Sequence, residues 1–515
     1  MAYFLTISKL SGMKPHRDFT RFRQALLVAA ALAACATPAT AERSLFAMDT
    51  GTRDAKTQTY AQQAALAKRL GYSGIGFTGC AKIPEMLAAA DAEGIEMSTI
   101  YTGLQIKNGK VGLDGQLETA IGQLAGRETV IWIFLGGSRP DDPSKTDAPV
   151  VEALQKLADL AAKSKLKIAL YPHVGAYAER VDDCVRVAKK VGRANLGVTF
   201  NLCHWLKVDG EDLEASLTDA MPHLFVVTVN GADSDGSGWN TLIQPLDSGS
   251  FDVAQVMRLL DKLGYQGSVG LQHYGILGDA AQNLGRSMAG WRGLQARSGA
   301  EKVLLMPGGD LSAFKDKAAW LPVAEVGLDP KNANKLIGKT PGAAAVLNGP
   351  GGRTGYLVTK REFGDVEAHI EFMIPGSSNS GVYFMGRYEV QVYDSHGVEK
   401  DKYPGLECGG IYPRWIDGKN VEGHSPRVNV SRPPGEWQSF HVIFRAPRFD
   451  KDGKKTANAK FEEVWHNGTL IHENLELKGP TRASIGGGES ATGPLMLQGD
   501  HGPVAYRKVW MAELK

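Results

Sequence analysis

Cysteine is scarce in this 515-residue sequence, which has five, and no two of them form a CxxC pair. A thiolate zinc cluster is therefore not supported, and a chain of this length can bury a sufficient core without disulfides. The 61 glycines follow no period, which excludes collagen and solenoid repeats. Hydrophobic residues at 43% and charged residues at 22% are typical of a globular protein with two or three domains.

Clusters of one charge and long apolar runs are also missing. The 58 lysines and arginines nearly balance the 56 acidic residues, and no basic cluster could neutralise a phosphate backbone. Nucleic acid is therefore not an expected partner. The clearest apolar stretch, residues 25–34, is well short of the roughly 20 residues that cross a bilayer. The sequence predicts no transmembrane segment.

Residues 1–41 have the pattern of a cleaved signal peptide. Basic residues precede the apolar stretch, and Ala39-Thr-Ala41 offers small residues for cleavage before Glu42. As an alternative, Leu32-Ala-Ala-Cys35 resembles a bacterial lipoprotein box, which would leave a lipid anchor on Cys35. Both routes predict an exported, periplasmic protein.

Residues 44–297 alternate short apolar runs with amphipathic helical patterns. Eight buried strands that are each followed by a helix imply a parallel sheet covered by helices, and about 250 residues suit a closed (βα)8 TIM barrel. The predicted strands are Leu45–Met48, Gly74–Phe77, Glu96–Ile100, Thr129–Leu135, Lys167–Tyr171, Leu196–Phe200, Phe225–Val229 and Ser268–Leu271.

Polar residues follow several of these strands, at the barrel end where active sites form. His173 and His204 come from adjacent strands, and histidine suits proton transfer near neutral pH. We therefore predict His173 and His204 as catalytic residues. Asn201 and Gln272, also at strand ends, are predicted to bind substrate hydroxyls.

This half resembles the sugar isomerase/epimerase family with a xylose isomerase-like barrel, through Ile168–His173, Gly197–His204 and Val269–Gln272. The resemblance implies a divalent metal at late strand ends, where this chain has Tyr171, Asn201 and Gln272 in place of carboxylates. Neutral groups hold a hard cation far less well, so sugar binding without the metal is favoured. A zinc-like ion held by His173 and His204 with Asn201 and Gln272 is the alternative, and the cofactor stays open.

After a predicted linker at 298–310, residues 311–515 change to short alternating runs separated by Pro and Gly turns, which predicts an all-β sandwich or jelly roll. Asn467-Gly468 predicts a hairpin. Along Tyr388–Asp394, alternation places Tyr388, Val390 and Val392 on the core face, and Glu389 and Gln391 on the opposite one.

This half resembles the 3-keto-disaccharide hydrolase family, which has a concanavalin-like jelly roll. The matching motifs are Asn379-Ser-Gly381, Tyr388–Gln391, Pro434–Trp437, and Leu497–Gly502 followed by Arg507. The resemblance implies that Glu389, Gln391, His501 and Arg507 line a sugar-binding face. We predict that His501 and Glu389 supply the base and the acid, with either one as the base, and that Gln391 and Arg507 are donors to the enolate oxygen. Asn379 and Tyr383 are further predicted substrate contacts.

The two resemblances imply one reaction sequence on a 3-keto-glycoside. A ketone at C3 acidifies the C2 hydrogen, so a base can drive elimination of the C1 substituent in the jelly roll. The barrel would then hydrate the 3-keto-2-hydroxyglucal. The alternatives are an isomerase or epimerase barrel with a carbohydrate-binding jelly roll, and a cell-surface glycan-binding protein without turnover.

Overall fold

The computed structural model describes residues 43–107, 110–112, 115–297, 300–349, 351–399 and 407–514. Ser44–Lys515 form one compact unit. The predicted signal peptide, Cys35 and the start of the predicted linker lie outside the described residues. Across the described ranges, no helix combines the length and apolarity needed to cross a membrane.

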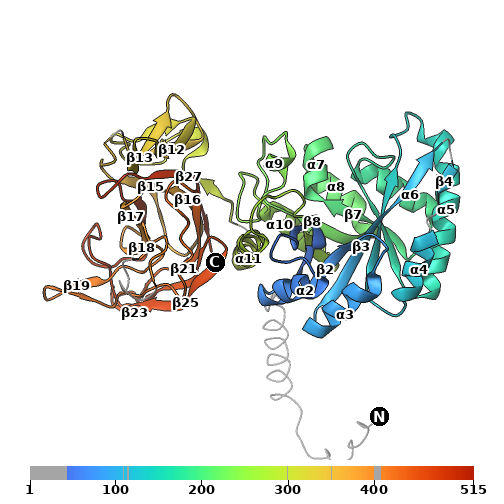
Figure 1. The fold of residues 1–515 in the computed structure, drawn as a ribbon, viewed down its shortest axis with the longest axis horizontal. Helices are drawn as coiled ribbons and strands as arrows, with labels where there is room; N and C mark the ends of the chain where they lie inside the picture. The colour runs from blue at the N-terminus through green and yellow to red at the C-terminus, as the bar shows by residue number, and fades with distance from the viewer. Residues whose placement is uncertain are drawn as a thin grey trace, which may run out of the picture. The chain divides into compact units, whose positions relative to one another are not determined.

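Eight parallel strands close into a barrel in the first half (Figure 1). Closure is shown by β1, which pairs with β2 on one side and with β9 on the other. The predicted (βα)8 barrel is confirmed. Its strands are β1 (Leu45–Met48), β2 (Gly74–Thr78), β3 (Glu96–Lys107), β5 (Val130–Gly136), β6 (Lys167–Tyr171), β7 (Leu196–Asn201), β8 (Leu224–Val229) and β9 (Ser268–Leu271), and β4 (Lys110–Gly112) adds an antiparallel edge to β3.

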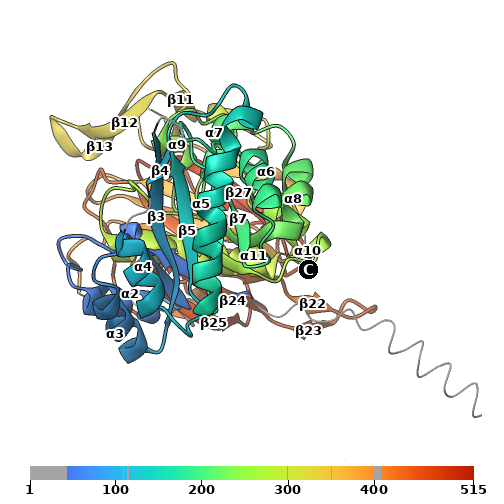
Figure 2. The ribbon, with the colours of Figure 1, turned by 90° about the vertical axis from the view of Figure 1, so that its right-hand side faces the viewer.

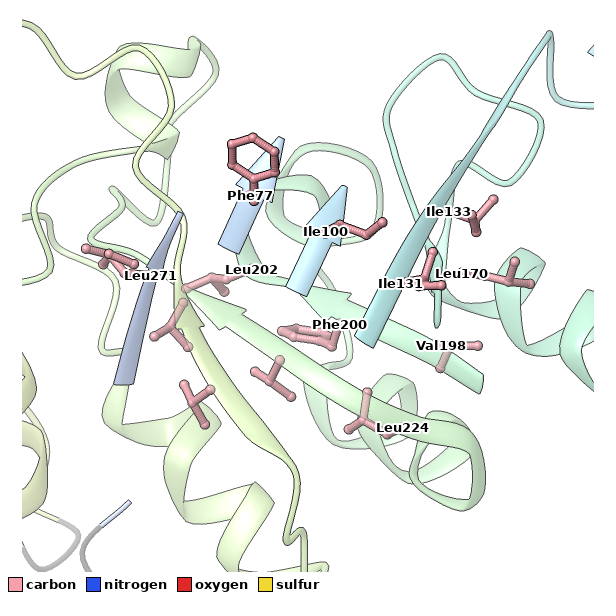
Figure 3. Packing of buried hydrophobic residues seen from close by; sticks show 14 of the residues in the cluster. Phe77, Ile100, Ile131, Ile133, Leu170, Val198, Phe200, Leu202, Leu224 and Leu271 are labelled. Carbon is pink, nitrogen blue, oxygen red and sulfur yellow. The ribbon is translucent and has the colours of Figure 1, made fainter. Parts of the chain in front are cut away.

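Helices cover the outside of this barrel, as Figure 2 shows for α5. Their apolar faces pack on strand residues such as Ile131, Val198 and Phe200, which are fully buried (Figure 3). Such near-continuous burial explains the unbroken apolar runs in the sequence. The helices are α2 (Tyr60–Arg69), α3 (Ile83–Glu93), α4 (Gly115–Gln123), α5 (Pro143–Lys163), α6 (Val181–Val191), α7 (Leu202–Val208), α8 (Leu213–Ala220), α9 (Trp239–Leu242), α10 (Ala254–Lys262) and α11 (Ala280–Ala296).

Two antiparallel sheets make up the second half, drawn from yellow to red in Figure 1. The smaller sheet has the order β15-β26-β17-β18, and the larger has the order β11-β14-β27-β16-β21-β24-β25. Alternate residues of both sheets, among them Ile370, Phe372, Val382 and Val390, meet in one buried core. The predicted jelly-roll sandwich is confirmed.

The strands of these two sheets are β11 (Leu321–Val323), β14 (Ala345–Leu347), β15 (Leu357–Phe363), β16 (Val366–Met373), β17 (Asn379–Phe384), β18 (Tyr388–Tyr393), β21 (Gln438–Arg445), β24 (Ala459–His466), β25 (Thr469–Leu477), β26 (Gly493–Leu497) and β27 (Ala505–Glu513). Separate hairpins are formed by β12 (Glu325–Asp329) with β13 (Asn332–Lys339), by β19 (Arg414–Ile416) with β20 (Lys419–Val421), and by β22 (Arg448–Phe449) with β23 (Lys455–Ala457).

Two details differ from the sequence interpretation. Residues 381–393, whose sequence has no Pro or Asn-Gly turn and so suggests one strand, form parts of two, because Met385 and Gly386 adopt positive φ angles of 55° and 63° and turn the chain between β17 and β18. The segment taken as a linker contributes strand β10 (Val303–Leu304), which pairs with β27. Leu305 and Met306 follow it into the jelly-roll core, so the sandwich starts before residue 311.

Candidate functional site

A cavity of about 370 Å³ opens at the carboxyl ends of the barrel strands. It lies where the fold class places its active sites. His173 and His204, at the ends of β6 and β7, both line it, as does Gln272 after β9. The rest of the lining is mostly apolar or aromatic: Met48, Thr50, Thr78, Tyr101, Trp132, Tyr171, Trp239, Ile243 and Tyr274.

The two histidines are neighbours, with ring centroids 4.3 Å apart. His173 Nδ1 lies 2.8 Å from the Val174 carbonyl oxygen, which can only accept, so Nδ1 carries the proton and Nε2 has a lone pair. The Val174 N–H donates to His204 Nδ1 at 3.4 Å, so the proton of neutral His204 is on Nε2. The backbone of Val174 therefore fixes opposite tautomers in the two neutral rings. His173 has an acceptor at Nε2, and His204 has a donor at Nε2.

Burial favours the same neutral, proton-donating form of His204. Desolvation and the adjacent His173 lower the pKa of His204 to about 3, so His204 stays neutral at ordinary pH. Gln272 is held in place, because its Nε2 donates to the Tyr171 hydroxyl at 3.1 Å while its Oε1 accepts from the backbone N–H of His273 and Tyr274. The cavity thus combines an acceptor, a donor and a fixed carboxamide among aromatic rings.

Asn201 does not join this group. Its Nδ2 donates to Thr199 Oγ1 at 2.8 Å and its Oδ1 accepts from Thr228 Oγ1 at 2.6 Å, so the carboxamide is used inside the barrel. Tyr171 is neutral, and the Gln272 carboxamide is already hydrogen-bonded. No carboxylate lies among the cavity-lining residues. The residues present therefore do not fit the divalent metal that the barrel family implies.

A second group of predicted residues meets on the outer face of the smaller jelly-roll sheet. Glu389 on β18 pairs with Tyr383 on β17, and the Tyr412 N–H donates to the Glu389 carbonyl on the other side. In the next row, Gln391 lies between Gly381 and Gly410, and the Gln498 N–H donates to the Gly381 carbonyl. The space over Gly381, beside Gln391, is filled by the Glu389 carboxyl and the Tyr383 ring.

Glu389 is the residue with unusual electrostatics. Its side chain is 2% exposed, and burial raises its pKa to about 8, with an opposing contribution from the Tyr383 hydroxyl. At pH 7 the carboxyl is therefore largely protonated and able to donate a proton. Gln391 Nε2 donates to Asn379 Oδ1 at 2.9 Å, so these two predicted contacts are adjacent.

His501 lies at the edge of this face, after β26. Its Nδ1 is 2.5 Å from Asp500 Oδ1, and Asp500 Oδ2 accepts from the Tyr356 hydroxyl at 3.0 Å. Asp500 orients the imidazole and leaves Nε2 as an acceptor. Sequence reasoning missed Tyr356, Tyr412 and Asp500. Asp500 lies within the Leu497–Gly502 motif, whereas Tyr356 and Tyr412 can be recognised only from strand register.

Arg507 is not brought to this face. It lies on β27 of the larger sheet, where Nε donates to Glu371 Oε2 at 2.6 Å and the guanidinium lies 4.0 Å from the Trp437 ring centroid. The neighbouring Tyr506 is fully buried in the sandwich core, so alternation turns Arg507 to the opposite side. The structure gives Arg507 a salt-bridge and stacking role.

Among the described residues, Asp247, His369 and His441 are a buried group whose ligand atoms lie within 4.8 Å of one another. Asp247 already bonds Arg286 Nε at 3.0 Å. Further cations surround the group: Arg297 pairs with Glu367, beside His441, and Lys302 lies 4.5 Å from the Trp510 ring centroid. Because arginines already neutralise these carboxylates, we assign the group to packing between the barrel and the jelly roll.

Comparison with known families agrees with both halves. Residues 64–292 match the xylose isomerase-like TIM barrel family, and residues 283–512 match the family described as a 3-keto-alpha-glucoside-1,2-lyase-like domain. Both predicted resemblances are confirmed. The fold and the two matches define a sugar isomerase-like barrel followed by a lyase-like jelly roll.

Individual proteins are similar over parts of the chain. The mouse "Putative hydroxypyruvate isomerase" is 30% identical over 105 residues, which are 20% of this chain and 35% of that protein. The structure of a "putative glycosyl hydrolase" from Parabacteroides distasonis is 28% identical, covering 41% of this chain and 84% of its own, with a TM-score of 0.29. The 3-keto-D-glucoside 4-epimerase from E. coli is 19% identical, covering 49% of this chain and 98% of its own, with a TM-score of 0.40.

Proposed function

We propose that the protein cleaves 3-keto-glycosides in two steps, elimination in the jelly roll followed by hydration in the barrel. The support is the buried Glu389 on the outer face of the smaller sheet in a lyase-like domain, where burial raises its pKa to about 8. A single carboxylic acid in that state suits proton donation to a leaving group. The usual paired-carboxylate mechanism of glycosidases needs a second, ionised carboxylate across the bond.

In the elimination, His501 Nε2 removes the C2 proton, which the C3 ketone has acidified. The C1–O bond then breaks, a C1=C2 double bond forms, and Glu389 protonates the departing glycosidic oxygen. Asp500 supports the imidazolium that results. Gln498, whose backbone N–H donates to Gly381, would donate to the C3 oxygen through its side chain, in the role predicted for Arg507.

In the hydration, the product is an unsaturated ketone that accepts water at C1. His173 Nε2 takes a proton from the water, and the His204 Nε2–H donates to the oxygen at C3 as negative charge develops there. The protonated His173 then returns a proton to C2. The net result of both steps is hydrolysis of the glycosidic bond, and neither step needs a metal.

The test is NMR of the full chain with a methyl 3-keto-glucoside in D₂O. Deuterium at C2 of the released sugar is expected, because the C2 proton is exchanged between the two steps. Fast cleavage without deuterium at C2 would contradict elimination. Equal cleavage of the unoxidised glucoside would contradict the need for the ketone.

The opposed histidine tautomers also suit an epimerase, which needs an acid and a base on one substrate. In that case the barrel would change the configuration of a keto sugar, and the jelly roll would only bind it. Glu389→Gln separates the two: cleavage by elimination is lost in the variant, whereas epimerisation in the barrel is retained.

We also propose that the protein is exported to the periplasm. The support is the leader-like sequence at residues 1–41 with its two candidate processing points. Mass spectrometry of the mature N-terminus after cell fractionation tests this. A chain starting at Glu42 indicates simple cleavage, a lipid on Cys35 indicates the lipoprotein route, and an intact Met1 in the cytoplasm contradicts export.

A further inference from the structure

One side of the barrel cavity is formed by the loop between β9 and α11. Gln272 and Tyr274, at the start of this loop, both line the cavity, whereas Leu277 further along is 91% exposed. Gly275 and Gly278 adopt positive φ angles of 76° and 106°, which glycine reaches without strain. A short loop with two such glycines needs contacts from outside to hold a cavity-lining side chain in one position.

The first turn of α11 supplies such a contact. Asn283 Nδ2 donates to the Leu277 carbonyl at 3.0 Å, so the end of the loop is bonded to this turn. The Asp279 side chain caps the helix by accepting from the Gln282 N–H at 3.0 Å. A movement of the first turn is therefore passed to the loop, and through the loop to Tyr274.

The jelly roll lies directly against α11 (Figure 1). A side chain at Gly285 would overlap the Gly468 carbonyl oxygen, and a side chain at Gly468 would overlap the Gln282 carbonyl oxygen. Gly468 belongs to the predicted Asn467-Gly468 turn, which connects β24 to β25 of the larger sheet. The two backbones therefore touch near the start of the helix, where only glycine leaves enough room.

A guanidinium of the jelly roll is bonded to the same turn. Arg432 Nη2 donates to Gln282 Oε1 at 2.6 Å. Arg432 is itself fixed within the jelly roll, because its Nη1 donates to the Trp437 carbonyl at 2.9 Å and its backbone N–H donates to Gln438 Oε1 at 3.0 Å. Since a charged donor makes a strong hydrogen bond, Arg432 restrains the Gln282 side chain and the turn that carries it.

Helix α2 offers a comparison within the same chain. It begins with Thr59-Tyr-Ala-Gln62, and Gln62 Oε1 accepts from the N–H of the N-cap Thr59 at 3.0 Å, which closes a capping box. The segment Asp279-Ala-Ala-Gln282 has the same sequence signature, but the Gln282 oxygen accepts from Arg432. Arg432 therefore uses the acceptor that completes the helix cap in α2.

We propose that Arg432 is a positioning residue for the barrel cavity. Through Gln282 it holds the first turn of α11, and that turn holds the loop that carries Tyr274. The barrel then reaches full activity only with the jelly roll docked on α11, although no described residue of the jelly roll lines the cavity. The inference rests on the proposed function for its kinetic readout, the hydration of the 3-keto-2-hydroxyglucal.

The experiment measures hydration of the 3-keto-2-hydroxyglucal by variants of the full chain. Arg432→Gln is expected to lower kcat/KM about tenfold, mainly through KM, because a displacement of about 1 Å can cost about 10²-fold. Gln282→Ala should have the same effect, and the double variant should be no worse than either single one, since both remove one bond. Gln282→Glu keeps the acceptor and should stay close to the wild type. An unchanged KM in Arg432→Gln overturns the inference.

Arg292→Gln is the matched control. Arg292 lies near the other end of α11, and its Nη1 donates to Glu463 Oε1 of the jelly roll at 2.6 Å. This variant also loses a contact between the two halves, but one that is several turns away from the cavity loop. Its KM for hydration should therefore match that of the wild type.

Hydrogen exchange followed by mass spectrometry separates this inference from the proposed function. The backbone amides of residues 273–279 should exchange several-fold faster in Arg432→Gln than in the wild type or in Arg292→Gln. Exchange that is no faster in Arg432→Gln than in Arg292→Gln overturns the positioning role, whatever the wild type catalyses. Faster exchange in Arg432→Gln, with no hydration of the glucal by the wild type, supports the positioning role and overturns the proposed hydration.

Discussion

Gly381 on β17 and Glu389 on β18 are diagonal neighbours, and a side chain at residue 381 would overlap Glu389 Oε1. The carboxyl group therefore occupies space that only glycine leaves open. This explains why the Asn379-Ser-Gly381 motif accompanies Tyr388–Gln391 in one sequence.

Gly381→Ala should reduce cleavage by about 10²-fold or more, because the displaced carboxyl can no longer protonate the leaving group. The measurement is the cleavage rate of methyl 3-keto-glucoside, with circular dichroism to confirm folding. Gly327→Ala is the matched control, since that strand glycine has open space where its Cβ would lie. Equal rates in the two variants would remove Glu389 from the reaction.

The pH dependence of cleavage tests the acid role of Glu389 directly. Since its pKa is raised to about 8, the carboxyl holds its proton below that pH and loses it above, so cleavage should fall as the pH rises through about 8. Glu389→Gln should cleave about 10² to 10⁴-fold more slowly and lack this alkaline limb. A rate that increases through the same range would make Glu389 the base.

The same raised pKa predicts an effect on folding. The folded state keeps a proton on Glu389 between pH 4.5 and about 8 that the unfolded chain has released, so the stabilisation present below pH 4.5 is lost as pH rises to about 8. Between pH 5 and 8, unfolding by urea should therefore show a smaller loss of stability with pH in Glu389→Gln than in the wild type. Parallel curves would contradict the buried, protonated carboxyl.

The barrel histidines can be tested with the 3-keto-2-hydroxyglucal supplied directly. His173→Gln and His204→Gln should each slow hydration by about 10² to 10⁴-fold, because one removes the acceptor and the other the donor. Glu389→Gln, in the other half, is the comparison that should hydrate the glucal faster than either. Since the pKa of His204 is about 3, its protonation should not limit hydration above pH 4.

Metal removal should leave hydration intact. The cavity has no carboxylate among its lining residues, and Asn201 is bonded to Thr199 and Thr228. Dialysis against EDTA should therefore leave the hydration rate unchanged. A large loss that added Mn²⁺ or Zn²⁺ restores would show that the histidines hold an ion after all.

Contact between the halves is predicted to contribute to stability. Arg286 of α11 donates to Glu371 Oε1 of β16 at 3.1 Å, and Glu371 also accepts from Arg507. Glu371→Gln should cost about 3–5 kcal/mol, because it removes a buried carboxylate that Arg286 and Arg507 share and leaves Arg286 with Asp247 alone. In urea unfolding, the exposed pair Glu152–Lys156 serves as control, and Glu152→Gln should cost about 1 kcal/mol or less.

Much of this architecture can be predicted from the sequence, because buried faces produce regular patterns of apolar residues. Strand β6, Lys167–Tyr171, was predicted at both ends, since a strand covered on both faces is a continuous apolar run. His173 and His204 were found because strand ends of a barrel converge. The orientation of Glu389 followed from the two-residue repeat of β18.

Other features depend on relationships that a linear pattern does not contain. Arg507 lies in the right motif, but sheet membership places it behind the sandwich, and that depends on which strands pair. Asn201 lies at its strand end as predicted, as the last residue of β7, yet the nearby hydroxyls of Thr199 and Thr228 satisfy its carboxamide. Tyr412 reaches Glu389 through an irregular segment with no strand signal of its own.

Strand β27 pairs with β10, β14 and β16, which come from residues 303–304, 345–347 and 366–373. A ribosome has to synthesise the chain past Ala505 before these three earlier strands can obtain their shared neighbour. Until then β14 and β16 have unpaired edges, the kind of surface that nascent chains use to aggregate. We therefore expect the barrel to form first during translation and the sandwich to close late, as a single event.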